Sequence, residues 1–215
     1  MKLYPIRKLV VSGDFITNCY ILDREGKCFI IDPGYEKDKI QDYIKREKLE
    51  VIGILLTHAH IDHMEALDCF DVPIYIHEIE YEVLMNDDLN GFGFFHKHKR
   101  YDLSKMEIIK INENTIIPLG KEQISVIHCP GHTIGGVTFK IGHDLYTGDT
   151  LFEASVGKWD RPTANLEDLK KSVIKLIDEQ PAHMLIHPGH GRSSSIGMEK
   201  QINSFYHQWK RELND

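Results

Sequence analysis

One short segment of the chain concentrates side chains that bind metals. Residues 57–63 have the sequence THAHIDH, so three imidazoles and one carboxylate fall within six positions, directly after an apolar run. Imidazole nitrogens and carboxylate oxygens are the ligands that zinc and similar divalent metals prefer. An isolated histidine is more often a surface or hydrogen-bonded core residue, but this density predicts one part of a metal site. The candidate ligands in this segment are His58, His60, Asp62 and His63.

Three later segments supply further candidate ligands. His132 lies in the sequence CPGHT, Asp149 in TGDT and His190 in PGHG. Each segment follows a short apolar or alternating run that predicts a strand, and the glycine or proline beside each polar residue allows the backbone to turn sharply. Loops held by strand ends are where a scaffold presents reactive side chains. We therefore expect the four segments to meet and form one site.

Together, these motifs resemble those of the metallo-β-lactamase-fold superfamily. The set consists of HxHxDH at residues 58–63, PGHT with His132, GDT with Asp149 and PGHG with His190. The run GDTLF at residues 148–152, followed by Gly157 and Lys158, is similar to the glyoxalase II group of thioester hydrolases. The resemblance extends from about residue 10 to about residue 195. It implies an α/β fold, namely an αββα sandwich with the site along one edge of the sheets.

The resemblance also implies a dinuclear metal site. One metal needs about four ligands, so seven ligand groups fit two ions that share a carboxylate. Zinc is the expected metal, with iron and manganese as alternatives. Carried over by position, the first metal would be held by His58, His60 and His132, and the second by Asp62, His63 and His190, with Asp149 as the bridge.

Two divalent cations about 3.5 Å apart lower the pKa of a shared water toward neutrality, which provides hydroxide as a nucleophile. Asp62 and Asp149 are therefore the expected catalytic residues, and Asp62 both binds metal and aims the hydroxide. One metal would polarise the substrate carbonyl. A thioester suits this chemistry, because a thiolate with a conjugate-acid pKa of about 8.5 leaves without a strong general acid. Lys158 is a candidate contact for a substrate carboxylate, although it is equally typical of a solvated loop.

Some positions depart from the glyoxalase II pattern. That family continues past its last motif histidine with a helical domain that binds glutathione, whereas 25 residues follow His190 here. In the run GKWDR at residues 157–161, Lys158 matches the family but Asp160 stands where a tyrosine is common. Met64, Glu65 and Ala66 replace the glycines that usually follow HxHxDH. These departures leave the thiol and the acyl group of the substrate open.

The main alternative is a persulfide dioxygenase of the same fold, in which one iron is held by residues that match His58, His132 and Asp149. Two histidines and one carboxylate leave open positions for oxygen and substrate. Lys158 stands where these enzymes have arginine, and that replacement is not conservative at a binding site. A lactonase is a further alternative. A lactamase is disfavoured, because those enzymes often have a cysteine ligand on the segment that holds Asp149, and none lies there.

Composition is that of an ordinary globular protein. The 215 residues predict a single domain spanning 1–215, with 41% hydrophobic and 27% charged residues. A net charge of −7 disfavours a nucleic-acid partner, with the basic run at residues 96–100 as a local exception. No apolar run reaches the roughly 20 residues that span a bilayer, and no signal-peptide pattern is present. Four scattered cysteines favour a cytoplasmic location. We expect a small-molecule thioester or ester substrate, with the oligomeric state open.

Apolar periodicity predicts two halves that each run from strands to helices. The first half has expected strands at 9–11, 18–23, 27–32, 51–57 and 74–76, and expected helices at 36–48, 63–70 and 79–85. The second half has expected strands at 108–117, 123–129, 137–141, 144–147 and 184–187, and expected helices at 165–179 and 198–213. Residues 86–102 are rich in glycine and charge, which predicts a mobile loop near the site. Its aromatic residues, Phe92, Phe94, Phe95 and Tyr101, are candidates for a pocket wall.

The other histidines lack an obvious role. His77, His143, His183 and His207 have no partner at ligand spacing, which predicts surface or core positions. His128 is expected to point away from His132 if the strand continues.

Overall fold

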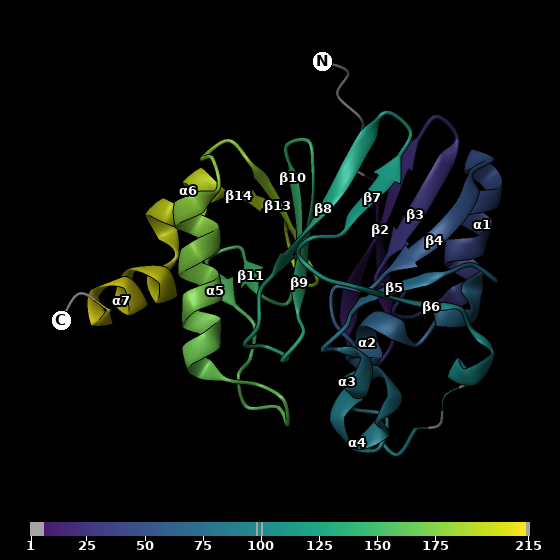
Figure 1. The fold of residues 1–215 in the computed structure, drawn as a ribbon, viewed down its shortest axis with the longest axis horizontal. Helices are drawn as coiled ribbons and strands as arrows, with labels where there is room; N and C mark the ends of the chain where they lie inside the picture. The colour runs from purple at the N-terminus through teal and green to yellow at the C-terminus, as the bar shows by residue number, and fades with distance from the viewer. Residues whose placement is uncertain (1–6, 98, 100, 214–215) are drawn as a thin grey trace.

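The computed structural model describes residues 7–97, 99 and 101–213, and it forms an αββα sandwich (Figure 1). Two six-stranded sheets face each other, and helices cover their outer sides. The first sheet has the order β1 (Arg7–Ser12), β2 (Ile16–Arg24), β3 (Lys27–Ile31), β4 (Glu50–Leu55), β5 (Ile74–His77) and β6 (Ile108–Ile111). The second has the order β14 (Ser194–Ser195), β13 (Leu185–Pro188), β10 (Asp144–Gly148), β9 (Val137–Ile141), β8 (Glu122–His128) and β7 (Ile116–Leu119). The predicted fold class is confirmed.

Side-chain alternation along the strands builds three apolar layers. In β2, Tyr20 and Leu22 face the second sheet, whereas Cys19 and Ile21 face the opposite layer, under the helices. The layer between the sheets joins these residues to Phe139 and Tyr146 of β9 and β10. The strand ends are consequently held in register on both sheets, which fixes the loops that follow them.

The main helices each bury one apolar stripe. Helix α1 (Lys37–Glu47) packs Ile40 and Ile44 on the first sheet. Helix α5 (Leu166–Glu179) begins where the Asn165 side chain accepts a hydrogen bond from the Asp168 amide at 3.1 Å, a common N-cap arrangement. Its apolar stripe packs against the second sheet, together with α6 (Ile196–Ile202) and α7 (Ser204–Glu212).

The predicted strand at 108–117 is wrong, because the chain changes sheets within it. Residues 108–111 form β6 at the edge of the first sheet, and residues 116–119 form β7 at the edge of the second. Between them the Asn112 carbonyl accepts the Thr115 amide at 2.9 Å, and the Asn112 side chain accepts the Asn114 amide at 3.1 Å. This turn, built on an asparagine side chain, interrupts two apolar runs that look continuous in sequence.

Two predicted helices are shorter than expected. The helix at 198–213 is divided into α6 and α7 at Asn203, whose side chain accepts the Tyr206 amide at 3.2 Å and whose amide group donates to the Ser155 carbonyl at 3.1 Å. The helix at 63–70 is replaced by α2 (Ile61–Met64) and a 3₁₀ turn at Leu67–Cys69. Helix α3 (Tyr81–Met85) confirms the third predicted helix of the first half.

The remaining elements are short. They are α4 (Asp87–Asn90), a 3₁₀ turn at Leu103–Lys105, and the two-stranded ribbon of β11 (Leu151–Phe152) and β12 (Ser155–Val156). The segment predicted as a loop at 86–102 therefore contains a helical turn. Of its basic run, His98 and Arg100 lie outside the described residues, while Lys97 pairs with Asp14 and Lys99 with Asp87. Among the described residues, no helix is long and apolar enough to cross a bilayer.

Candidate metal centre

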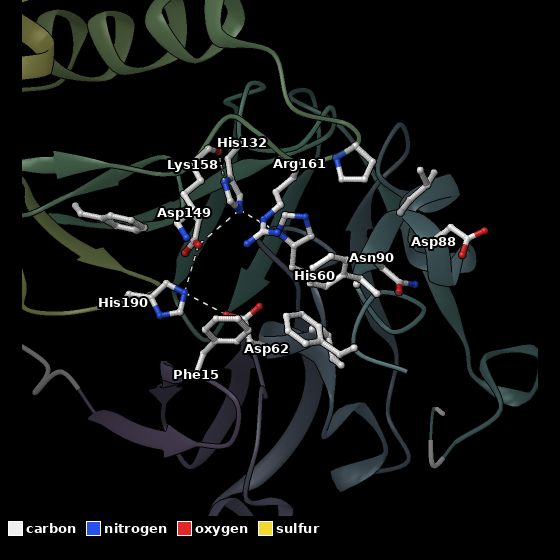
Figure 2. Close-up of a pocket in the computed structure, with 17 residues that line it drawn as sticks. Phe15, His60, Asp62, Asp88, Asn90, His132, Asp149, Lys158, Arg161 and His190 are labelled. Carbon is white, nitrogen blue, oxygen red and sulfur yellow. Dashed lines mark hydrogen bonds and ion pairs between the residues drawn. The ribbon is translucent and has the colours of Figure 1, made fainter. Parts of the chain in front are cut away.

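The ends of four strands place all seven predicted ligands around one point. The loop after β4 carries His58 and His60, and the following helix α2 carries Asp62 and His63. The loops after β8, β10 and β13 carry the other three, which are His132, Asp149 and His190. Figure 2 shows five of the seven converging on the floor of a cavity.

Three histidines form the first half of this centre. His58, His60 and His132 each offer a ring nitrogen, and these atoms lie within 4.8 Å of one another. The Nδ1 atom of His60 lies 2.9 Å from the Nε2 atom of His132. The side chains of His58 and His132 are buried, whereas that of His60 is partly exposed, and His60 and His132 line the cavity.

Asp62, His63 and His190 form the second half, again with ligand atoms within 4.8 Å. The Nε2 atom of His190 lies 3.2 Å from Asp62 Oδ2, and the Nε2 atom of His63 lies 3.7 Å from the same oxygen. His63 is fully buried, whereas His190 is partly exposed to the cavity.

Asp149 stands between the two halves. Its Oδ2 atom lies 3.3 Å from His190 Nε2 and 3.6 Å from His132 Nε2, and its Oδ1 atom lies 3.4 Å from His63 Nε2. One carboxylate therefore reaches histidines of both halves, which is the position required of a bridging ligand.

Buried atoms without partners show that these residues fit metal ions. Among the described residues, the Nε2 atom of His58 is buried and has no hydrogen-bond partner, and the buried His63 Nε2 and Asp149 Oδ1 atoms make no hydrogen bond although they lie 3.4 Å apart. Such orphaned polar atoms are costly unless something else binds them. Two nitrogen- and oxygen-bound divalent cations would satisfy them, with one triad each and Asp149 between.

The charges of the site support the same interpretation. Burial lowers the pKa of His58, His60 and His132, that of His60 to about 3, so these imidazoles are neutral and have lone pairs for a metal. Burial also acts to lower the pKa of His190, but Asp149 and Asp62 outweigh it and raise this pKa to about 10. The same carboxylates raise the pKa of His63. In the second half, His63 and His190 therefore carry protons, and the carboxylates that stabilise this positive charge would also stabilise a bound cation.

Three of the ligand histidines are oriented by hydrogen bonds from Nδ1, the ring nitrogen that faces away from the centre. The Nδ1 atom of His63 lies 2.9 Å from Asp32 Oδ2, that of His132 lies 2.7 Å from the Lys158 carbonyl, and that of His190 lies 2.7 Å from the Ile16 carbonyl. Each contact assigns the ring proton to Nδ1 and leaves Nε2 directed at the centre. Asp32, His58 and His63 also lie close enough to one another to hold a metal ion. We assign Asp32 a supporting role instead, because its carboxylate already accepts hydrogen bonds from Thr57 and His63.

Glu80 links two of the ligand loops. Its buried carboxylate accepts the Ala59 amide at 2.9 Å and the Gly135 amide at 2.8 Å, and burial raises its pKa to about 7. The loop with His58 and His60 is thereby joined to the loop with His132. A side chain at Gly135 would overlap the Glu80 backbone, so glycine is required at this close approach. Neither Asp32 nor Glu80 belongs to a sequence motif, and sequence reasoning missed both.

A cavity of about 310 Å³ opens onto the metal centre. Its walls are mainly apolar and include Phe15, Phe94, Phe95 and Phe152. Of the aromatic residues predicted to wall the pocket, Phe94 and Phe95 do so. Phe92 is instead buried in the core, and the Tyr101 hydroxyl donates to the Met64 carbonyl at 2.6 Å.

Two cationic side chains also line this cavity. Lys158 was predicted from the sequence and Arg161 was missed; Figure 2 shows both on the same side of the cavity as His132. The Arg161 guanidinium lies 5.9 Å from the centroid of the Phe94 ring. An apolar cavity with two cations beside a metal centre suits a substrate that has apolar and anionic parts.

Comparison with known proteins identifies the family. The model of the metallo-beta-lactamase superfamily matches residues 12–190. The chain belongs to the metallo-β-lactamase superfamily. A probable metallo-hydrolase of Bacillus subtilis, YqgX, is 33% identical over 90% of this chain and 93% of that protein. Family and homologue support a metal-dependent hydrolase.

Two solved structures share the fold over nearly all of their length. The B3 metallo-β-lactamase BLEG-1 is 29% identical, with a TM-score of 0.81 over 94% of this chain and 99% of that chain. The protein TTHA1623, solved in a di-iron-bound form, is 30% identical, with a TM-score of 0.80 over 91% of this chain and 98% of that chain.

Proposed function

We propose that this protein is a dinuclear metal-dependent hydrolase that cleaves thioesters. The position of Asp149 between two complete triads carries the proposal, because a site for one ion has no need of the second triad. The di-iron form of TTHA1623 supports a pair of ions in this fold. The metal of this protein is proposed to be zinc, with iron and manganese as alternatives that the same ligands accept.

The seven residues divide into two sets in this proposal. His58, His60 and His132 would hold one cation, Asp62, His63 and His190 would hold the other, and Asp149 would be shared between them. When bound, the cations supply a water of lowered pKa as the nucleophile and polarise the carbonyl of the substrate.

Asp62 has a second role, which is to orient the nucleophile. Its Oδ2 atom faces His190 at 3.2 Å and accepts from the Thr17 hydroxyl at 3.5 Å, which restrains that oxygen. The same side chain lines the cavity, where it can accept a hydrogen bond from water. Asp62 is therefore placed to aim a water at a carbonyl above the centre.

The lining of the cavity supports a proposal about the kind of thioester. Its phenylalanine walls favour an apolar acyl or thiol part, while Lys158 and Arg161 favour a carboxylate or another anionic group on the substrate. A thiolate leaves without protonation by a strong acid, which suits a cavity whose lining beyond the metal centre is mainly apolar. The small-molecule substrate is thus an anionic thioester with an apolar part.

A panel of substrates on the zinc-loaded protein tests this function. It should contain aromatic and aliphatic acyl thioesters with and without a carboxylate, S-lactoylglutathione, a lactone and a β-lactam. We expect kcat/KM to be highest for an anionic apolar thioester and to disappear when the metal is removed by a chelator. Faster turnover of the lactone would replace the thioester hydrolase with a lactonase.

A β-lactamase is a second candidate, because BLEG-1 is similar over nearly the whole chain. The β-lactam in the panel separates the two, since hydrolysis of an amide requires stabilisation of a leaving nitrogen. A persulfide dioxygenase would use one iron held by His58, His132 and Asp149 and would leave the second triad without a role. Oxygen uptake with a persulfide substrate, measured on iron-loaded protein, tests that alternative directly.

A further inference from the structure

Outside the candidate metal centre, three ligand-type side chains meet where the two sheets adjoin. His77 ends β5, His128 ends β8, and Glu113 lies in the turn between β6 and β7. Their ligand atoms lie within 4.8 Å of one another. The core position predicted for His77 is confirmed, and its two partners come from distant parts of the chain, which spacing along the sequence does not reveal.

The geometry of this cluster is compact. The imidazole rings of His77 and His128 stack with centroids 4.3 Å apart and an interplanar angle of 10°. The Oε1 atom of Glu113 lies 3.4 Å from His128 Nδ1, and its Oε2 atom lies 3.8 Å from His77 Nε2. The carboxylate thus faces one nitrogen of each ring.

One nitrogen in the cluster has no partner. The His77 side chain is only 2% exposed, and its Nε2 atom is buried without a hydrogen bond. A buried nitrogen of this kind costs free energy unless a ligand binds it. This nitrogen faces Glu113 inside the cluster; because His77 Nδ1 accepts the Ile79 amide at 3.4 Å, a metal ion there would replace the Nε2 proton.

His128 is oriented as metal-binding histidines commonly are. Its Nε2 atom donates to the Ile134 carbonyl at 3.1 Å, which leaves the Nδ1 lone pair free on the side of Glu113. Burial and the adjacent His128 lower the pKa of His77, so that ring is neutral at physiological pH. The pKa of Glu113 is also lowered, so it is ionised there. Neutral imidazole and ionised carboxylate are the forms that bind metals.

We propose that His77, Glu113 and His128 form a structural zinc site, separate from the dinuclear centre. Two imidazoles and a carboxylate can hold zinc with water as the fourth ligand, whereas most structural zinc sites have four protein ligands. Because the stacked rings direct these nitrogens side by side rather than at one point, binding requires the His128 ring to shift. Binding also replaces the long 3.4 Å contact from the Ile79 amide to His77 Nδ1. Both Glu113 and His128 have exposed parts that allow this movement.

Such an ion would stabilise two of the loops that form the candidate metal centre. His77 lies three residues before Glu80, whose carboxylate joins the loops of Ala59 and Gly135. His128 lies four residues before His132. A zinc ion between the ends of β5 and β8 would therefore tie together two loops of the candidate metal centre from outside it.

Zinc stoichiometry tests the proposal. Wild type, Glu113→Gln and His128→Gln proteins are dialysed against the same free zinc concentration, and bound zinc is counted by elemental mass spectrometry. The controls are Glu107→Gln, an exposed acid, and His183→Gln, which removes half of an exposed histidine pair that belongs to no three-ligand group in the described residues. We expect both cluster variants to bind about one zinc ion fewer per chain than wild type and the controls.

Thermal unfolding gives a second readout. Added zinc should raise the Tm of wild type more than that of Glu113→Gln, because an ion that binds only the folded state stabilises it. Equal zinc content and an equal Tm shift in wild type and Glu113→Gln would overturn the proposal. Glu113 is half exposed in a turn, so its variant should fold even if a His77 variant does not. The comparison is a difference between matched proteins, so it does not depend on how many ions the dinuclear centre holds.

Discussion

The Nδ1 atom of His63 lies 2.9 Å from the Oδ2 atom of Asp32, so a carboxylate outside every metal motif orients one of the candidate ligands. The same carboxylate accepts the Thr57 amide at 2.8 Å and the Thr57 hydroxyl at 2.6 Å. Asp32 thereby fixes both the start of the HxHxDH segment and the ring of its last histidine. Its φ of 52° lies in the left-handed region, which aspartate tolerates better than most residues.

Replacement of Asp32 by asparagine should weaken metal binding. Asparagine keeps the shape but provides only one acceptor oxygen for three donors, so His63 loses its fixed orientation. Loss of such a supporting partner typically reduces metal affinity by about 10-fold to 100-fold. Competition with a chromogenic chelator measures the change. Asp23→Asn is the control, because Asp23 pairs with Arg7 and not with a ligand. Equal zinc affinity in Asp32→Asn and wild type would contradict this role.

Asp149→Ala should abolish hydrolysis and much of the metal binding. The substitution removes the one carboxylate that reaches both triads, so two cations would face each other without a shared anion. His58→Ala should act in the same way by removing a buried ligand of the first triad. Asp42→Ala, an exposed acid of helix α1, is the matched control. Full turnover by metal-depleted Asp149→Ala protein would disprove the mechanism.

Lys158→Ala and Arg161→Ala should each raise KM several-fold and change kcat less. Both side chains line the cavity and would bind an anionic group of the substrate rather than the reacting carbonyl, so they would contribute to binding of the ground state and the transition state alike. Steady-state kinetics with an anionic thioester and its uncharged analogue measures the effect, which should vanish for the analogue. Arg192→Ala is the control, because Arg192 pairs with Glu153 and is exposed. An unchanged KM in the Lys158 variant would make Lys158 an ordinary solvated lysine.

Glu80 should make stability depend on pH. Burial raises the pKa of its carboxyl from 4.5 to about 7 in the folded protein, so folding favours the protonated form. The stabilising contribution is full below pH 4.5 and is lost as the pH rises through 7. Relative to Glu80→Gln, the wild type should therefore lose free energy of unfolding on the order of 3 kcal/mol across this window. Urea titrations of both proteins measure this, and a difference that stays constant with pH would contradict it.

Local sequence was sufficient to predict part of this molecule. Three histidines within six residues are informative wherever the chain folds, and a polar residue after a strand is placed at a sheet edge by the strand itself. The strand at 137–141 and the helix at 165–179 were predicted closely, because apolar alternation and an amphipathic stripe are local properties.

Contacts between distant segments could not be predicted in this way. Asp32 supports a histidine 31 residues later, and Glu80 reaches an amide 55 residues later. His77 meets His128 only because β5 and β8 end at the same place in the fold. The error at 108–117 has the same origin, since two apolar runs belong to different sheets and only the turn after Asn112 separates them.

Metal content tests the central claim most directly. Glu113→Gln protein, which lacks a ligand of the proposed structural site, is expressed with zinc or with iron, and its metals are counted by elemental mass spectrometry alongside thioester hydrolysis. The dinuclear hydrolase predicts about two ions per chain, acceptance of zinc and activity in the zinc form. One tightly held iron per chain, with zinc excluded or inactive, would contradict it and indicate a mononuclear oxygenase.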